Sequence, residues 1–267
     1  MKIQEIIDCL ESQGEWVNRQ YTRDHVLVGN GDMEIEKVIV CWVATNEVIR
    51  QAIQEQCHFI ITHENPFYMS GTSIPTEILY SQREKMELLN KHQITIYRCH
   101  DLWDLYPQIG VRDQWAQLLD LPFKNASSMH SYIRVSQPFD MSVQELAQHI
   151  IRNIEMYDEF GVEVIGNLQQ TVHCLGIGTG ACTDIIEMYH AGADVCLVSD
   201  DGINNWVHTQ WAMDHQIPLI VVNHLTSEAA GIRRLSQYLS CQFPNIEFQF
   251  IKNDYGIHHI EKGAVTK

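Results

Sequence analysis

Two short segments, far apart in the chain, each end an apolar run with an imidazole and a carboxylate. In ITHENPFY, His63 is followed directly by Glu64, and in VVNHLTSE, His224 precedes Glu228 by four residues. Both runs are typical of buried β-strands, and burying such side chains costs free energy unless a partner compensates them. A metal ion is one such partner, and two segments of this kind supply ligands for two ions.

Polar clusters also follow two other predicted strands. One extends from His100 to Asp104 in CHDLWD, and the other from Ser199 to Asp201. Because ligands bind at the carboxyl ends of strands in open α/β sheets, both clusters are candidates for the same kind of site. Imidazoles combined with carboxylates favour zinc, iron, manganese or cobalt over magnesium and calcium, which need oxygen ligands only. A single histidine at a strand end is more often an ordinary polar contact, so the prediction depends on the clusters occurring together.

The elements that must position these residues alternate between strand and helix. This alternation predicts an α/β protein with mainly parallel sheets, because β-α-β units pair through right-handed crossovers. The polar segment 124–131 is the best candidate for a boundary, so we expect a first α/β domain over 1–125 and a second over 126–267. The sequence leaves open whether the C-terminal strand and helix pack back on the first domain. The strands are expected within 34–45, 57–63, 93–100, 171–180, 195–201, 218–224 and 245–252.

Local geometry at the candidate ligands can also be predicted. Adjacent residues on an extended strand point to opposite faces, so we expect an irregular turn at residues 63–65 that lets both His63 and Glu64 reach one site. Glu228 lies one helical turn after His224, which suits a helix that starts near Thr226 or Ser227. The segment GIGTG is interpreted as a tight strand-to-helix turn, with Gly178 and Gly180 allowing close backbone approach, rather than as a phosphate-binding loop.

The composition is that of a globular chain with a large acidic excess. Of the 267 residues, 45% are hydrophobic and 19% are charged, and the formal net charge is −16. Such a surface repels phosphate backbones, so nucleic-acid binding is not expected. No apolar run approaches the roughly 18 residues of a membrane span, and the first residues do not form a signal peptide, which predicts a cytoplasmic protein without membrane contact. The eight cysteines contain no CxxC pair and are expected to be buried thiols.

Four segments, taken in order, carry a family resemblance. They are ITHENPFY; ITIYRCHDLWD with the following GVRDQWAQLLDLP; CLGIGTGACTDIIEMYHAGADVCLVSDD; and LIVVNHLTSEAAGIRRLSQYL. Together they resemble the Nif-three-like family, whose members are also called dinuclear metal-centre proteins or GTP cyclohydrolase type 2 homologues. The resemblance covers nearly the whole chain. It implies two interlocked α/β domains with two metal ions in the cleft between them, and ring-shaped homohexamers.

The resemblance also assigns residues. By position, His63, Asp104, His224 and Glu228 match the family's metal ligands, and Glu64 stands where the family usually has a second histidine. Because a carboxylate adds negative charge, Glu64 shifts the preference toward harder cations. A further histidine near the family's metals is matched by His100, either as a ligand or as a proton shuttle.

Three further positions depart from the family pattern. Ser199-Asp200-Asp201 replaces Thr-Gly-Asp, Asn205 stands where a histidine is frequent, and Asn223 replaces a glycine. These departures indicate a retained metal site in an altered pocket.

The sequence thus predicts a hydrolase with two divalent ions, acting on a small phosphorylated or nucleotide-like substrate through a metal-bridging water, with His100 as the catalytic residue. The alternative is a non-catalytic metal-binding or regulatory oligomer. No guanine-reading motif is identifiable, so the substrate and the GTP cyclohydrolase naming stay open.

Overall fold

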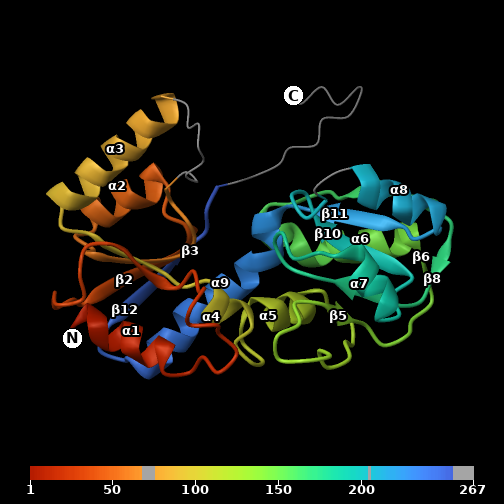
Figure 1. The fold of residues 1–267 in the computed structure, drawn as a ribbon, viewed down its shortest axis with the longest axis horizontal. Coiled ribbons are helices and arrows are strands. Elements are labelled where there is room, and N and C mark those ends of the chain that lie inside the picture. Colours follow the sequence, from red (N-terminus) through yellow and green to blue (C-terminus); the bar gives the residue numbers. More distant parts are fainter. Residues whose placement is uncertain (68–75, 204–205, 255–267) are drawn as a thin grey trace. The chain divides into compact units, whose positions relative to one another are not determined.

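The chain folds into two compact units in the computed structural model, which describes residues 1–67, 76–203 and 206–254 (Figure 1). Among the described residues, unit 1 comprises Met1–Gly110 and Gly231–Asn253, and unit 2 comprises Val111–Ala230 with Asp254. The division therefore falls after Gly110, whereas the sequence analysis placed it after residue 125.

Unit 1 is built around a five-stranded sheet in the order β1-β4-β3-β2-β12. Pairing is parallel from β4 through β3 and β2 to β12, and β1 runs antiparallel at the edge beside β4. The C-terminal strand thus returns to pair with β2 of the first part of the chain. The strands are β1 (His25–Val28), β2 (Lys37–Val43), β3 (Phe59–Glu64), β4 (Thr95–Arg98) and β12 (Glu247–Ile251).

The helices of unit 1 bury their apolar faces against this sheet. Val48, Ile49 and Ala52 of α2 pack with Ile39 and Ile60 of the sheet in one core cluster. Figure 1 shows α2 and α3 on one side of the sheet and α1 on the other. Because both faces are covered, β2 and β3 read as nearly continuous apolar runs. The helices are α1 (Ile3–Glu11), α2 (Asn46–Gln54), α3 (Thr76–Lys91) and the short α4 (Asp101–Asp104).

Unit 2 contains a second five-stranded sheet, ordered β5-β9-β10-β11-β7, and a small two-stranded sheet, β6-β8. The central strands β9, β10 and β11 are parallel, and the edge strands β5 and β7 are antiparallel to their neighbours. The strands are β5 (Arg134–Val135), β6 (Met141–Ser142), β7 (Glu163–Ile165), β8 (Thr171–Val172), β9 (Leu175–Ile177), β10 (Val195–Ser199) and β11 (Leu219–Val222).

Two hydrophobic clusters fill unit 2. One contains residues of α5 and α6, and the other contains residues of α7 and α8. The helical elements are α5 (Val111–Leu118), α6 (Val143–Ile154), the 3-10 turn η1 (Glu155–Tyr157), α7 (Ile185–His190), α8 (Trp206–Asp214) and α9 (His224–Gln242), which continues into unit 1. The predicted α/β class is confirmed. Parallel pairing holds for β4, β3, β2 and β12 in unit 1 and for β9, β10 and β11 in unit 2, and the other pairings are antiparallel.

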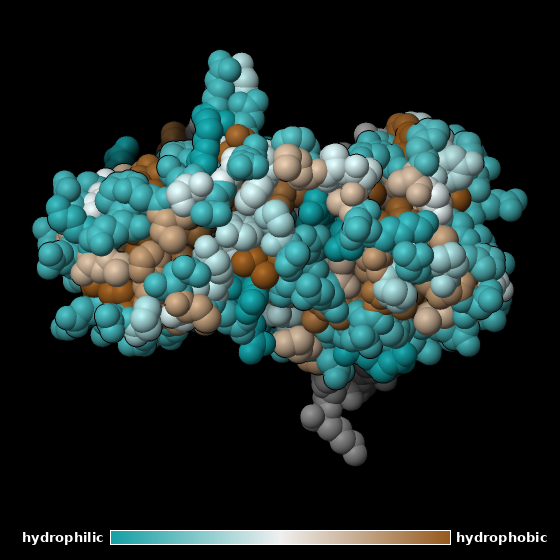
Figure 2. Space-filling model, turned by 90° about the horizontal axis from the view of Figure 1, so that it is seen from below, coloured by the Kyte–Doolittle hydropathy of each residue, from teal (hydrophilic) through white to brown (hydrophobic). Residues whose placement is uncertain are grey.

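Surface properties agree in part with the sequence analysis. Hydrophilic residues cover most of the face shown in Figure 2, with hydrophobic residues scattered among them. No helix within the described residues is long and apolar enough to cross a membrane. All eight cysteines lie in the described part of the chain and none forms a disulfide there, but only four are buried. Cys9 and Cys174 are half-buried, and the expectation of buried thiols is wrong for Cys182 and Cys241, which are exposed.

Candidate metal centre

The candidate ligands of unit 1 come from the ends of two neighbouring parallel strands. His63 lies near the end of β3, and the chain after β4 leads through His100 into the single turn of α4, which carries Asp104. The buried Asp24 carboxylate holds this turn, because its oxygens accept hydrogen bonds from the backbone N–H of His100 at 2.5 Å and of Leu102 at 2.9 Å. Burial raises the pKa of Asp24, against the lowering effect of these bonds.

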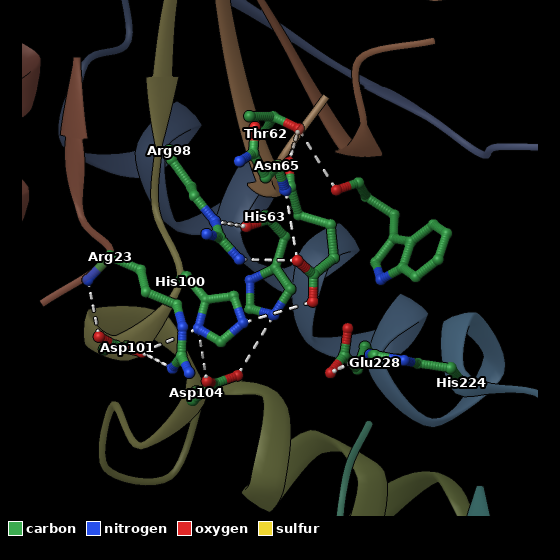
Figure 3. A network of polar contacts seen from close by, with 12 residues as sticks. Arg23, Thr62, His63, Asn65, Arg98, His100, Asp101, Asp104, His224 and Glu228 are labelled. Carbon is green, nitrogen blue, oxygen red and sulfur yellow. Dashed lines mark hydrogen bonds and ion pairs between the residues drawn. The ribbon is translucent and has the colours of Figure 1, made fainter. Parts of the chain in front are cut away.

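Three potential ligands converge in unit 1. His63 Nε2 lies 3.3 Å from Asp104 Oδ1, and His100 Nδ1 lies 3.1 Å from Asp104 Oδ2. The two imidazole rings stack with centroids 4.5 Å apart and an interplanar angle of 8°, and Figure 3 shows both beside Asp104. One ligand atom from each of the three residues lies within 4.8 Å of the others, which is a spacing that a single ion can bridge.

The tautomer of His63 follows from its second ring nitrogen. His63 Nδ1 lies 3.0 Å from the carbonyl oxygen of Cys99, and a carbonyl only accepts, so Nδ1–H is the donor. The Nε2 atom is thereby directed toward Asp104. Metal-binding histidines are commonly oriented in this way, by a hydrogen bond from the nitrogen that does not bind the metal.

Glu64 is paired with a cation that the sequence analysis missed. Arg98 donates from a terminal nitrogen to Glu64 Oε2 at 2.7 Å, and its Nε donates to the His63 carbonyl at 3.0 Å. Glu64 Oε1 lies 3.4 Å from His100 Nε2. The strand β3 continues through Glu64, so the predicted irregular turn at residues 63–65 is wrong for the first two of them. The charge that a carboxylate adds in place of a histidine is thus offset by Arg98.

In unit 1, the imidazoles and the carboxylates shift one another's pKa values. Burial lowers the pKa of His100, but the charge of Asp104 and hydrogen bonds to Asp101, Asp104 and Glu64 outweigh it and raise the pKa to about 12. Burial raises the pKa of Asp104, while the charges of His100 and His63 outweigh it and lower the pKa. In the metal-free chain His100 therefore keeps its proton at neutral pH, and a metal ion bound to this imidazole would displace that proton.

In unit 2, the candidate ligands lie on the first turn of α9. His224 Nε2 is 3.0 Å from Glu228 Oε1, and His224 Nδ1 donates to Asp201 Oδ2 at 2.8 Å. Burial lowers the pKa of His224, but Asp201 and Glu228 raise it to about 11. The hydrogen bond from His224 in turn lowers the pKa of Asp201. As with His63, a hydrogen-bond partner at Nδ1 directs Nε2 toward the neighbouring carboxylate.

The helix that carries this pair begins earlier than predicted. It starts at His224 rather than near Thr226 or Ser227, because two side chains cap its amide groups. Asp200 accepts from the His224 N–H and Asn223 accepts from the Leu225 N–H, each at 2.9 Å. Asp200 and Asn223 are two of the departures from the family pattern, and an Asn before an apolar helix is a recognisable capping signal.

Gly180 brings the predicted glycine turn against the ligand pair of unit 2. Its φ is +51°, and a Cβ atom at this position would lie 2.5 Å from His224 Nε2 and would collide with Glu228 Oε1. Its N–H donates to Ser227 Oγ at 2.9 Å. The expected close backbone approach at Gly180 is confirmed, and only glycine fits both the space and the backbone conformation.

The predicted residues therefore group within the two units. His63, Glu64, His100 and Asp104 come together in unit 1, and His224 and Glu228 come together in unit 2. Asn205 lies outside the described residues. Arg98 was missed because nothing in its local sequence marks its partner, and Asp201 was noted only as part of a polar cluster without a role.

Comparison with known proteins identifies relatives along almost the whole chain. A family model described as Duf34/NIF3 (NGG1p interacting factor 3) matches residues 1–255. The chain belongs to this family. The resemblance inferred from the four sequence segments is thereby confirmed.

Curated relatives of this NIF3 family member share one name. The "GTP cyclohydrolase 1 type 2 homolog" of Chlamydia trachomatis is 25% identical over 247 residues, which cover 88% of this chain and 92% of the relative. The homolog of the same name from Haemophilus influenzae is 23% identical over 229 residues, covering 84% and 87%. The chain therefore matches these relatives over most of their length.

Several solved structures share the fold of this chain. A Bacillus cereus protein related to NIF3 has a TM-score of 0.78 at 14% identity, covering 98% of this chain and 99% of that one. The protein ybgI, of unknown function, has a TM-score of 0.79 at 17% identity, covering 96% and 100%. HcgD from Methanocaldococcus jannaschii, in its reduced form, has a TM-score of 0.71 at 20% identity, covering 95% and 98%. At such low identity the likeness shows the fold alone.

Proposed function

We propose that this chain is a metal-dependent hydrolase that holds its ions with His63, His100 and Asp104 in unit 1 and with His224 and Glu228 in unit 2. The observation that carries the proposal is the convergence of three ligand atoms within 4.8 Å in unit 1. Imidazole nitrogen combined with carboxylate oxygen is the donor set of zinc, iron, manganese and cobalt. A bound divalent ion of this kind lowers the pKa of a water molecule toward neutrality and so supplies a hydroxide nucleophile for hydrolysis.

The chain's own residues prepare these positions. The Cys99 carbonyl and the Asp201 carboxylate orient His63 and His224, each by accepting from Nδ1. Glu64 remains a proposed ligand through Oε1, since Oε2 is engaged by Arg98. The positive charge of Arg98 offsets the negative charge of Glu64. The net charge of the proposed ligand set is therefore close to what a neutral histidine at position 64 would give.

His100 is assigned to the ligand set in this proposal. Without it, the buried ligands of unit 1 would be reduced to His63 and Asp104, fewer than the three protein ligands typical of catalytic zinc sites. Its predicted role as a proton shuttle is the competing assignment. The variant His100→Ala separates them, because a lost ligand lowers metal content, whereas a lost shuttle lowers turnover at unchanged metal content.

The proposed substrate class is a small phosphorylated or nucleotide-like compound. Its support is the name of the curated relatives, which refers to GTP cyclohydrolase, together with hydrolytic chemistry that the donor set fits. Nucleoside triphosphates and small phosphate esters are therefore the first compounds to test. Release of inorganic phosphate and of hydrolysed base products, followed separately, identifies which bond is cleaved.

Metal analysis by mass spectrometry tests the proposal. We expect two ions per chain in the wild type, and a lower metal content in His63→Ala, His224→Ala and Glu228→Gln. His215→Ala serves as the control, because His215 stacks on Trp211 at 4.1 Å and belongs to neither donor set. A wild-type chain without divalent metal, or unchanged metal content in all three ligand variants, would contradict it.

Bound metal with no turnover on the screened substrates would favour the alternative, a non-catalytic metal-binding or regulatory protein. The carboxylates around His100 favour this alternative, because Glu64, Asp101 and Asp104 all contact its ring nitrogens. An imidazole so engaged is poorly placed to move a proton to or from a substrate.

We also propose that the chain forms a homo-oligomer, with the hexamer implied by the family resemblance. Its support is the apolar surface of α8, where Trp206 is 72% exposed and Met213 62% exposed. Light scattering coupled to size-exclusion chromatography measures the oligomeric state directly, and a monomer at micromolar concentration would contradict this part of the proposal.

A further inference from the structure

The two ring nitrogens of His100 face different groups. Nδ1 lies 2.9 Å from Asp101 Oδ1 and 3.1 Å from Asp104 Oδ2, whereas Nε2 lies 3.4 Å from Glu64 Oε1. When one nitrogen of an imidazole binds an ion, the hydrogen bond made by the other determines which nitrogen is left for the metal. Two carboxylates compete for Nδ1 of His100, so the partner that holds this atom decides how the ring is presented.

Asp101 is itself held by Arg23, and Figure 3 shows Arg23 beside Asp101 and Asp101 beside His100. Asp101 Oδ2 accepts from the backbone N–H of Arg23 at 2.8 Å, and Oδ1 accepts from a terminal guanidinium nitrogen of Arg23 at 2.9 Å. A carboxyl group bonded to a guanidinium is ionised and only accepts, so the hydrogen in its contact with His100 is on Nδ1. The side chain of Asp101 is only 18% exposed, which limits the access of competing water.

The register of the sheet explains why these residues meet. The strand β1 runs antiparallel to β4 with His25 opposite Arg98, so the residues before β1 lie beside those after β4. Of the residues before β1, Arg23 bonds the carboxylate described above, and Asp24 accepts from the backbone N–H of His100. The segment before β1 therefore acts on both the backbone and the ring of His100.

Asp104 is the competing partner of Nδ1, but its other contacts favour a role as a ligand. Its Oδ1 lies 3.3 Å from His63 Nε2, and it belongs to the group of three converging ligands, which does not include Asp101. An ion bound by Asp104 would compete with Nδ1 for the electron pairs of this carboxylate. Asp101 has no such conflict, because its partner Arg23 lies outside the converging group.

We propose that Asp101, held by Arg23, is a positioning residue that keeps His100 bonded through Nδ1 and so directs Nε2, on the side of Glu64, to the metal. Its effect on metal binding rests on the proposed function. Its hold on the ring does not, because the contacts exist in the metal-free chain. Metal-binding histidines commonly bond a carboxylate in this way, and loss of that carboxylate costs about 10–100-fold in metal affinity.

NMR of the metal-free chain with nitrogen-15-labelled histidines tests the hold on the ring. We expect a slowly exchanging N–H signal from His100 Nδ1, identified by its absence in His100→Ala. It should be lost in Asp101→Asn, where Arg23 and Nδ1 compete for the single oxygen of the amide, and it should remain in Asp104→Asn. A signal that survives in Asp101→Asn would overturn the proposal, as would a wild-type chain without the signal.

Calorimetric titration with Zn²⁺ tests the consequence for metal binding. We expect Asp101→Asn to bind zinc about 10–100-fold more weakly than the wild type. Arg23→Met keeps the backbone N–H bond to Asp101 and should lose less affinity. The matched control is Asp32→Asn, which makes the same chemical change and the same loss of charge at a side chain that is 89% exposed, and it should bind zinc as the wild type does.

The zinc-loaded chain provides a readout that a general loss of stability would not change. In its NMR spectrum we expect His100 Nδ1 to keep its hydrogen and Nε2 to show the shift of a metal-bound nitrogen, and the reverse assignment would overturn the proposal. Equal zinc affinity in the wild type and Asp101→Asn would overturn this inference alone. A wild-type chain that binds no divalent ion would overturn the proposed function together with the effect of Asp101 on metal binding, while the metal-free signals still decide the hold on His100.

Discussion

Each candidate ligand histidine with a defined tautomer is held by the nitrogen that faces away from the site. His63 uses the Cys99 carbonyl and His224 uses the Asp201 carboxylate. A carboxylate partner makes the imidazole more basic than a carbonyl partner does, so the two histidines are not equivalent as ligands. At the scale of the residue, the partner of the second ring nitrogen therefore determines how strongly each proposed ligand holds both protons and metal.

Metal binding is predicted to release protons. Because the pKa of His224 is raised to about 11, the metal-free chain holds this proton at neutral pH, and an ion at Nε2 displaces it. Affinity should therefore rise with pH up to about pH 11, by about tenfold per pH unit for each proton released. Titration calorimetry at pH 7 in buffers of different ionisation heat counts these protons. We expect at least one per ion, and an affinity that does not change between pH 6 and 9 would contradict the argument.

The same pKa shift carries a prediction for the metal-free fold. The raised pKa of His224 stabilises the folded chain fully below its unfolded value of 6.5, and the contribution is lost as the pH rises toward about 11. Asp201→Asn removes the charged acceptor, so it should lessen this pH dependence of the free energy of unfolding. It should also weaken metal binding by about 10–100-fold, the usual cost of losing an orienting carboxylate.

Restoring the family histidine at position 64 is predicted to destabilise this chain. Glu64→His leaves Arg98 without its carboxylate, although Arg98 is only 11% exposed. We expect the free energy of unfolding of the metal-free protein to fall by about 2 kcal/mol, less than the roughly 3–5 kcal/mol for a fully buried ion pair because both side chains keep some exposure. The double variant Glu64→His with Arg98→Met should recover part of this loss. Denaturant unfolding of the wild type, of Glu64→His, of Arg98→Met and of the double variant measures the coupling, and purely additive effects would show that the pair is not an energetic unit.

At the scale of the element, the first turn of α9 and the turn after β9 together determine the positions of His224 and Glu228. The helix places His224 and Glu228 one turn apart on the same face, and the caps from Asp200 and Asn223 determine where that first turn begins. The turn then needs a residue without a side chain at Gly180. Local sequence predicted the glycine turn and the spacing of the pair, but it misplaced the helix start by overlooking Asn223 as a cap.

Gly180→Ala is predicted to disrupt the donor pair of unit 2. The added Cβ collides with Glu228 Oε1 and meets His224 Nε2, and the positive φ adds backbone strain. The matched control is Gly192→Ala, because Gly192 has φ +98° and nothing within 4 Å of an added Cβ. Both variants should lose about 1 kcal/mol of stability or more from the backbone, but only Gly180→Ala should lose metal. Equal metal content in the two variants would contradict the prediction.

At the scale of the whole molecule, unit 2 interrupts unit 1 in the sequence. Residues 111–230 form one continuous stretch, whereas unit 1 needs both 1–110 and 231–253. The strand β12 pairs with β2 over five residues from Glu247 to Ile251, so a chain that stops at residue 110 exposes the ladder edge of β2. The two units therefore differ in how much of the chain each needs to fold.

A fragment of residues 111–230 is predicted to fold on its own. Both hydrophobic clusters of unit 2 lie entirely within it, as do all strands of its five-stranded sheet. We expect a cooperative thermal transition by circular dichroism for this fragment. The fragment 1–110, which lacks β12, should show no cooperative transition or a much lower melting temperature. A reversed result would show that the division of the chain into units does not describe its stability.

The sequence by itself determined the alternation of strands and helices, the family, and the position of the proposed ligands at strand ends or in the segments that follow them. These features depend on local periodicity and on short motifs, which are visible without knowing what lies nearby in space. The tertiary structure alone decided which atoms face one another. Arg98 pairs with Glu64 across 34 residues, and Asp201 accepts a hydrogen bond from His224 across 23 residues. Such contacts depend on where the folded backbone brings distant side chains, which no local pattern records.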